Sequence, residues 1–283
     1  MAEILKGKPV ADSIKHNMIK DIEECKGKGL IPTLAIVRVG NRIDDVSYEN
    51  SILNRCAAMG IDTKLFSLDK DISMGEFTSI IGSINKDNKI HGLLTFRPLP
   101  KHLNSQFISK LISSEKDIDC MNSVNLEKIF EGNMEGFLPC TPEAVIEILK
   151  YYGYQIEGKN VTVINRNMVV GKPLSMMLLA ENATVTICHS KTKNLAQITS
   201  KADIVVAALG KANLLDNSYF NRSSIVIDVS INDAGAGKIC GDVDFEAVKD
   251  NVAAITPVPG GVGSVTTNLL LKHVVKAAKK TCK

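Results

Sequence analysis

The segment that follows residue 160 has the residue types of a phosphate-binding turn. An apolar run, Val161–Ile164, leads through a polar loop to Gly171, and Pro173 indicates that a helix begins nearby. A strand that opens onto a helix N-terminus offers free backbone N–H groups and the positive end of the helix dipole to a pyrophosphate. The usual GxGxxG pattern is missing and Gly171 is the loop's only glycine, so a plain strand-to-helix turn remains an alternative.

Two cations and a hydroxyl stand near this turn, where an NAD site would carry a carboxylate. The next apolar run, residues 184–188, is followed by His189, Ser190 and Lys191, and Arg166 lies on the first loop. An Asp or Glu at this point would bind the ribose 2′-hydroxyl of NAD. Cations and a hydroxyl suit the 2′-phosphate of NADP better, so we expect NADP and leave NAD open. The alternative is that Lys191 is merely solvated and that Ser190 caps the following helix.

A glycine-rich loop near the C-terminus is a second candidate for lining a site. Residues 256–264 read TPVPGGVGS. The prolines restrict the backbone of this loop, and the glycines permit close approach to a ligand. We therefore expect Pro259, Gly260 and Gly261 to border a binding site rather than to form a linker.

Metal chemistry is not expected from the cysteines and histidines. The chain has 7 Cys and 5 His, all dispersed, with no CxxC pair and no HExxH motif. An odd number of cysteines cannot all pair within one chain, so reduced thiols in a cytosol are the natural interpretation.

The elements that would position these loops alternate between strands and helices. The first part predicts strands at 33–39, 62–68 and 91–95 and helices at 46–59, with Asp45 as a possible cap, and 74–85. Thr141 followed by Pro142 predicts a helix that ends at Gly153. The second part predicts buried strands at 161–164, 184–188, 204–209 and 225–230, and a final helix at 264–280.

This alternation predicts an α/β protein of two domains, each with a mostly parallel sheet and with a cleft between them. The second domain should be a doubly wound, Rossmann-like dinucleotide-binding domain. We place the first domain at residues 1–140, completed by the C-terminal helix 264–283, and the second at 141–263.

Length and charge agree with two domains and exclude several classes of partner. The chain has 283 residues, which is roughly two domains at typical sizes. The formal net charge is +3, from 34 basic and 31 acidic residues, so nothing favours nucleic acid or an anionic membrane surface. The apolar runs are far shorter than a membrane span, and the N-terminus has no secretory pattern, so we expect a cytoplasmic protein.

Several segments, taken in order, resemble the bifunctional methylenetetrahydrofolate dehydrogenase/cyclohydrolase family. The most specific are PVPGGVG and PCTP; the others are VGNRIDDVSYENS, GLLTFRPLPKHL, EKDIDC, NRNMVVGKP, ATVTICHSKT, ADIVVAALGK, VIDVSIN and GDVDF. They cover nearly the whole chain. The resemblance implies a homodimer, a cleft for tetrahydrofolate one-carbon derivatives between the domains, and a nicotinamide cofactor on the second domain.

The resemblance also implies roles for residues at matching positions. Tyr48 matches a tyrosine that lies against the folate rings, and Asp119 matches a carboxylate that hydrogen-bonds the pterin, although it could also be a turn residue. The folate site would include Ile52, Phe96, Pro98, Leu99, Pro259, Gly260 and Gly261. The dinucleotide site would include Asn165, Arg166, Asn167, Val170, Gly171, Ser190, Lys191, Ile231 and Thr266.

Two departures from the family's pattern bear on the chemistry. The family has a lysine four residues after the tyrosine, where this chain has Ile52, and a glutamine two residues before Pro-Leu-Pro, where it has Phe96. Hydrolysis of a methenyl cation needs a titratable group, whereas hydride transfer does not. We therefore expect NADP-dependent oxidation of 5,10-methylenetetrahydrofolate, with cyclohydrolase activity lost or weak. Three other positions differ from the family's pattern. The family has glycine where this chain has Asn165 and Ser230, and it has proline where this chain has Ser264.

Three alternatives remain. The enzyme could still be bifunctional with a relocated base, for which Arg55, Lys101 and Lys116 are near enough in sequence, although arginine is a poor base. It could be a non-catalytic folate- or nucleotide-binding protein. It could also be a different Rossmann dehydrogenase, which Tyr48, Asp119 and the PVPGGVG loop disfavour.

Overall fold

The computed structural model describes residues 2–235 and 237–281. The chain divides into two compact units, which we name by their main sheets. The six-strand unit comprises Met1–Ser13, Ile129–Met134 and Pro139–Thr266. The three-strand unit comprises Ile14–Lys128, Glu135–Leu138 and Thr267–Lys283. Each unit is described by itself below.

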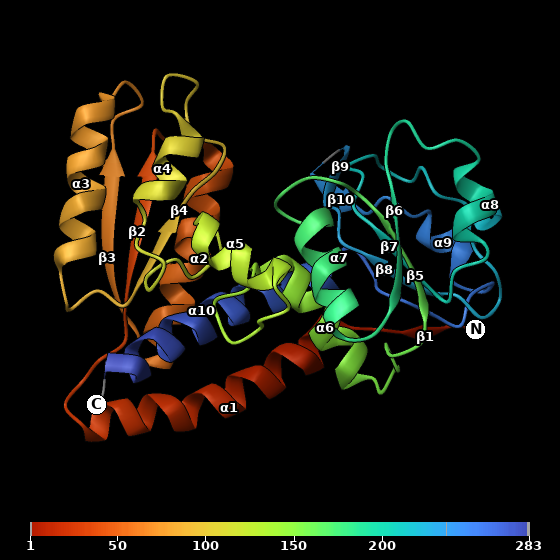
Figure 1. Ribbon diagram of the computed structural model, residues 1–283, viewed down its shortest axis with the longest axis horizontal. Coiled ribbons are helices and arrows are strands. Elements are labelled where there is room, and N and C mark those ends of the chain that lie inside the picture. The colour runs from red at the N-terminus through yellow and green to blue at the C-terminus, as the bar shows by residue number, and fades with distance from the viewer. Residues whose placement is uncertain (1, 236, 282–283) are drawn as a thin grey trace. The chain divides into compact units, whose positions relative to one another are not determined.

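The six-strand unit is built on a parallel sheet in the order β1-β11-β8-β7-β5-β6 (Figure 1). The strands are β1 (Glu3–Ile4), β5 (Asn160–Ile164), β6 (Thr184–Cys188), β7 (Ile204–Ala207), β8 (Ile225–Asp228) and β11 (Ala254–Ile255). The central strands β7 and β8 are buried along their whole length, as their continuous apolar sequences predict. Strand β6 is more exposed because it lies at the edge of the sheet.

The remaining elements of this unit connect and cover the sheet. The helices are α6 (Cys140–Tyr151), α7 (Gly171–Ala180), α8 (Leu195–Thr199) and α9 (Phe245–Val248), with a 3₁₀ turn at Asn217–Tyr219. An antiparallel pair, β9 (Asn232–Gly235) and β10 (Lys238–Cys240), stands apart from the main sheet.

Strand order changes direction at β5. The chain passes from β5 to β6 on one side and then to β7 on the other side of β5. Ligands of doubly wound sheets bind outside the carboxyl ends of the strands at this kind of switch point. The predicted α/β class, with parallel sheets and a Rossmann-like second domain, is confirmed.

The three-strand unit holds a parallel sheet in the order β3-β2-β4. Its strands are β2 (Thr33–Val39), β3 (Asp62–Leu68) and β4 (Gly92–Thr95), and its helices include α2 (Ile43–Met59), α3 (Met74–Lys86) and α4 (Ser105–Leu111). Helices α1 (Gly7–Gly27), α5 (Ser123–Phe130) and α10 (Val262–Thr281) contribute residues to both units. Strand β2 is buried throughout, and its residues pack with Phe77 and Ile81 of α3 in one core.

Two predicted helix starts are wrong. Helix α2 begins at Ile43, so Asp45 lies in its first turn. A carboxylate there interacts favourably with the helix dipole but does not cap the helix. Helix α6 begins at Cys140 with Pro139 before it, so Thr141 is already helical. The N-terminal boundary also differs from the sequence estimate. Strand β1 pairs with β11, and residues 1–13 therefore belong to the six-strand unit rather than to the first domain.

Within the described residues, no helix combines the length and apolar character needed to cross a membrane.

Candidate functional site

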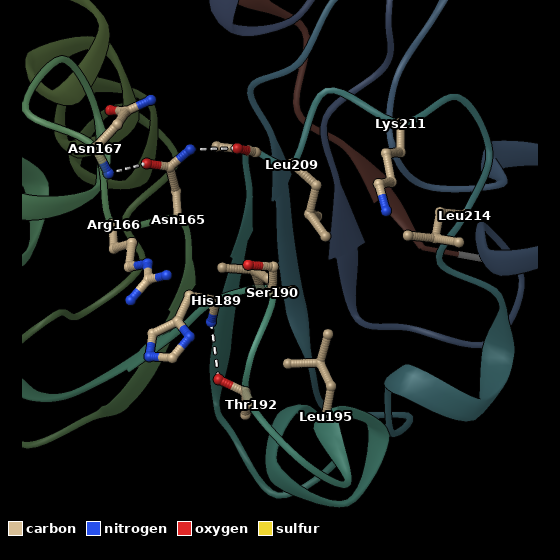
Figure 2. A pocket seen from close by; sticks show the side chains of 12 residues that line it. Asn165, Arg166, Asn167, His189, Ser190, Thr192, Leu195, Leu209, Lys211 and Leu214 are labelled. Atoms are coloured by element: carbon tan, nitrogen blue, oxygen red, sulfur yellow. Dashed lines mark hydrogen bonds between the residues drawn. The ribbon is translucent and has the colours of Figure 1, made fainter.

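A cavity of about 380 Å³ lies where β5, β6 and β7 end (Figure 2). It is lined by residues that directly follow the carboxyl ends of these strands. The lining is Ile164, Asn165, Arg166, Asn167, His189, Ser190, Thr192, Leu195, Ala208, Leu209, Lys211 and Leu214. The cavity thus occupies the switch point of the sheet, and four of the predicted cofactor residues, Asn165, Arg166, Asn167 and Ser190, line it.

Asn165 fixes the loop between β5 and α7. Its Nδ2 donates to the carbonyl oxygen of Ala208, 2.5 Å away, and its Oδ1 accepts from the backbone N–H of Asn167 at 2.7 Å (Figure 2). The Asn167 side chain in turn accepts from the N–H groups of Val169 and Val170 at 3.0 and 2.8 Å. A glycine at position 165 could make none of the side-chain bonds. This asparagine therefore joins the loop to the end of β7.

Gly171 is needed because helix α7 begins against the same loop. A Cβ atom at residue 171 would lie 2.2 Å from the carbonyl oxygen of Asn165 and 2.7 Å from the N atom of Arg166. Both are backbone atoms, so neither can turn aside. Val170 and Gly171 are not among the residues that line the cavity. They hold the lining loop close to the start of the helix.

The turn after β6 presents Ser190 to the cavity. The N–H of His189 donates to Thr192 Oγ1 at 2.9 Å, and the N–H of Lys191 donates to His189 Nδ1 at 3.1 Å. The residue at the N-cap of α8 is Asn194. The alternative that Ser190 caps this helix is therefore wrong.

Other predicted cofactor residues do not line the cavity. Lys191 is exposed beside it, and Ile231 is 63% exposed. Thr266 donates to the carbonyl oxygen of Gly263 at 3.1 Å. Their roles stay predictions.

Sequence reasoning missed Lys211 and the group that positions it. Asp242 is fully buried and accepts hydrogen bonds from Leu209 N at 2.5 Å, Lys211 N at 2.7 Å and Ser230 Oγ at 2.6 Å. This carboxylate shapes the chain from 209 to 211, which forms one wall of the cavity. Lys211 could have been found from its place just after the buried run at 204–209. The long-range contacts of Asp242 have no local signal.

The cavity has the charge and surface that an anionic dinucleotide requires. Arg166 and Lys211 contribute cationic side chains to its lining. Leucines 195, 209 and 214 supply apolar surface. Among the described residues that line the cavity there is no Asp or Glu, in agreement with the sequence after β6. Binding of a phosphorylated ligand would therefore meet no carboxylate in the wall.

The glycine-rich loop is tightly built but is not part of this cavity. Gly260 has a φ of +102°, and its carbonyl oxygen accepts from the N–H of Gly7 at 2.7 Å. A Cβ atom on Gly261 would lie 2.5 Å from the carbonyl oxygen of Pro257. Pro259 and Gly260 are exposed, so a ligand could reach this edge of the loop.

In the three-strand unit, Tyr48 and Phe96 form an aromatic pair. Their ring centroids are 5.5 Å apart and their planes are inclined by 35°. Tyr48 lies on α2 and is 42% exposed, whereas Phe96 follows β4 and is 7% exposed. Ile52 lies one turn after Tyr48 on the same helix and is fully buried. The residues at the two departures are therefore apolar and enclosed, beside a tyrosine ring that solvent can reach.

Asp119 lies in the turn after a buried bridge and forms an ion pair. Its Oδ2 is 3.1 Å from Nη2 of Arg97, and both side chains are partly exposed. Pro98 follows Arg97 through a cis peptide bond, and Leu99 is buried.

The neighbouring carboxylate, Asp117, has a different role. It is buried and accepts hydrogen bonds from the backbone N–H groups of Met121 and Asn122 at 2.7 and 2.8 Å. Burial raises the pKa of Asp117. Asp117 therefore builds the turn, and Asp119 is the carboxylate that this turn presents.

The other cations considered as replacement bases are placed differently. Lys116 donates from Nζ to the carbonyl oxygens of Ile84, Asn85 and Asp87 at 2.7–2.9 Å, at the end of α3. Burial lowers the pKa of Lys116, but its ammonium is engaged with these carbonyls. Lys101 and Arg55 are exposed.

Metal ligands do not gather in the described part of the chain. No group of three or more His, Cys, Asp or Glu side chains there could hold an ion.

Comparison with known proteins adds independent information. Residues 5–119 match the catalytic-domain model of the tetrahydrofolate dehydrogenase/cyclohydrolase family, and residues 139–282 match its NAD(P)-binding-domain model. The "Bifunctional protein FolD" of Clostridium botulinum is 58% identical over 280 residues, which is 99% of each chain. A "Bifunctional protein FolD 1" of Desulfitobacterium hafniense is 56% identical with the same coverage.

Solved structures agree in fold. A FolD methylenetetrahydrofolate dehydrogenase/cyclohydrolase from Campylobacter jejuni is 38% identical with a TM-score of 0.97, and covers 99% of this chain and 100% of its own. The enzyme from Trypanosoma brucei, solved with NADP cofactor and inhibitor, is 32% identical with a TM-score of 0.93, over 99% and 98% of the two chains. Both family models and the full-length relatives lead to one conclusion: the chain belongs to the tetrahydrofolate dehydrogenase/cyclohydrolase family.

Proposed function

We propose that this protein oxidises 5,10-methylenetetrahydrofolate to 5,10-methenyltetrahydrofolate with NADP and that it lacks an effective cyclohydrolase activity. The observation that carries the second part is the enclosed apolar character of Ile52 and Phe96 next to Tyr48. The first part is supported by the family, by the cavity at the switch point and by the cations that line it.

The oxidation requires little acid–base catalysis by protein side chains. A C–H bond of the one-carbon bridge breaks, and its electron pair leaves as hydride while a ring nitrogen shares its lone pair with the carbon. The bound cofactor supplies the hydride acceptor. The side chains hold and orient the substrate: Tyr48 and Phe96 offer ring surface to the pterin, and Asp119 accepts hydrogen bonds from its N–H groups.

Hydrolysis of the methenyl cation, in contrast, requires acid–base catalysis. A water molecule must lose a proton as it attacks, so a side chain that takes up protons has to stand within hydrogen-bond reach. Isoleucine and phenylalanine cannot do this. Lys116, a partly buried lysine near the site segments, is held by the carbonyl oxygens at the end of α3.

A second candidate function is supported by the relatives. The bacterial proteins that are more than half identical to this chain are named bifunctional. On that ground the protein would also hydrolyse methenyltetrahydrofolate to 10-formyltetrahydrofolate with a base other than the family lysine. By the same resemblance we propose that the protein is a homodimer and that it is located in the cytoplasm. Sedimentation analysis of the purified protein would test the homodimer.

Two assays on one preparation separate these functions. With methylenetetrahydrofolate and NADP, we expect NADPH to form, which its characteristic absorbance measures. With methenyltetrahydrofolate, we expect decay no faster than the spontaneous rate in buffer. Enzymatic hydrolysis that keeps pace with NADPH formation would establish the bifunctional alternative. A protein that binds both ligands and forms no NADPH would be a binding protein.

Cofactor choice gives a further prediction. Replacing Arg166 by alanine should weaken NADP binding by about tenfold or more, because it removes a cation from the cavity wall, and should change NAD binding much less. Dissociation constants for both cofactors measure this. The matched control is Arg222→Ala, an exposed arginine in the same unit that does not line the cavity. Equal losses for NAD and NADP would contradict a 2′-phosphate contact.

A further inference from the structure

We propose that Arg97 is a specificity-determining residue of the folate half-site, by which we mean Tyr48, Phe96, Arg97 and Asp119. Arg97 stops this half-site from favouring the methenyl product, whose ring system is cationic, over tetrahydrofolates whose ring system is uncharged. This inference rests on the proposed function, which places Asp119 against the pterin. It starts from the ion pair between Arg97 Nη2 and Asp119 Oδ2, whose atoms are 3.1 Å apart.

Arg97 is the next residue in the chain after the Tyr48–Phe96 ring pair. It follows Phe96 in sequence, and the tilted rings of Phe96 and Tyr48 pack together with centroids 5.5 Å apart. Leu93, on the strand β4 that ends just before Phe96, forms a parallel bridge with Asp117, which brings the turn carrying Asp119 alongside β4. Direct contacts or peptide bonds therefore join Tyr48, Phe96, Arg97 and Asp119.

The net charge of the Arg97–Asp119 pair determines how tightly the half-site binds the cationic product relative to the substrate. Methenyltetrahydrofolate carries one positive charge more than methylenetetrahydrofolate or tetrahydrofolate, and the rest of the molecule is alike. A carboxylate alone would attract that charge, and the product would be held more tightly than the substrate. The guanidinium of Arg97 offsets the carboxylate, so the pair carries no net charge toward the ligand.

Two neighbouring side chains are apolar, and two neighbouring carboxylates are already hydrogen-bonded within the protein. Ile52 and Phe96 are apolar, and the nearby Glu49 carboxylate is buried and bonded to Arg38 Nε at 2.7 Å. Asp117 faces the backbone N–H groups of its own turn. Asp119 and Arg97, at 26% and 33% side-chain exposure, are thus an ion pair that a ligand in contact with solvent can meet.

The test compares Arg97→Gln with Arg97→Lys. Glutamine keeps a hydrogen-bond donor for Asp119 and removes the charge, whereas lysine keeps the charge. Methenyltetrahydrofolate and tetrahydrofolate are each measured as competitive inhibitors of NADPH formation in initial rates, before spontaneous hydrolysis. The ratio of the two inhibition constants cancels any general damage to the site. A variant with no turnover is titrated by stopped-flow quenching of tyrosine fluorescence, since the chain has no Trp.

We expect Arg97→Gln to shift the ratio in favour of methenyltetrahydrofolate by about fivefold, because one partly screened charge is lost. Arg97→Lys should leave it near the wild-type value. An unchanged ratio in Arg97→Gln, or an equal shift in both variants, would overturn the proposal. Failure of the proposed function looks different: the wild-type protein would then form no NADPH from methylenetetrahydrofolate.

Discussion

Replacing Gly171 by alanine should reduce NADP affinity by about a hundredfold, the scale expected when binding groups are displaced by about 1 Å. The added Cβ would lie 2.2 Å from Asn165 O, and relief requires the loop that carries Asn165 and Arg166 to move. These residues line the cavity. The expected overpacking also costs about 1–3 kcal/mol of folding free energy.

The control for this variant is Gly82→Ala. Gly82 lies inside helix α3, and an added Cβ there meets no atom within 4 Å. That change should leave NADP affinity unaltered and stabilise the protein slightly, because alanine favours a helix by up to about 1 kcal/mol over glycine. Isothermal titration with NADP and thermal unfolding measure both effects. Near-wild-type affinity in Gly171→Ala would show that the loop can shift without disturbing the cofactor site.

The sequence predicted the elements well where a strand is buried on both faces. Residues 33–39 form such a strand, as their apolar run predicts. Residues 62–68, partly exposed at the edge of the sheet, were predicted from their alternating pattern instead. Helix starts were harder. Asp45 is a good capping residue by type, yet the helix begins at Ile43, after an Arg42 N-cap that makes no side-chain capping bond.

The site could be predicted in part. The loop after β5 and Ser190 after β6 line the cavity as the sequence predicts, because ligands of doubly wound sheets bind where the strands end. Asp242 was missed as a positioning group, since its partners lie 10 to 33 residues away along the chain. The Arg97–Asp119 pair was missed for the same reason: a charge at position 97 shows no partner until the turn at 117–119 is placed beside β4.

Replacing Glu49 by leucine should lower the free energy of unfolding by about 3 kcal/mol or more, because it leaves a buried arginine without its counter-ion. Arg38 and Glu49 are 6% and 4% exposed, and Arg38 Nε lies 2.7 Å from Glu49 Oε2. Arg38 also donates to Asn41 Oδ1 and Ser67 Oγ at 2.5 and 2.9 Å, but these neutral groups cannot balance its charge. Urea unfolding followed by circular dichroism measures the loss.

The double variant Arg38→Met with Glu49→Leu separates the pair from its burial. Two apolar side chains of similar length remove both charges, so we expect stability to return to within about 1–2 kcal/mol of wild type. Asp71→Asn, which breaks an exposed pair with Lys70, should change stability by less than about 1 kcal/mol. If Glu49→Leu is no worse than Asp71→Asn, the arginine finds compensation elsewhere. If the double variant is as unstable as Glu49→Leu, then the hydrogen bonds of Arg38 to the loop before α2, rather than charge balance, hold the helix that carries Tyr48.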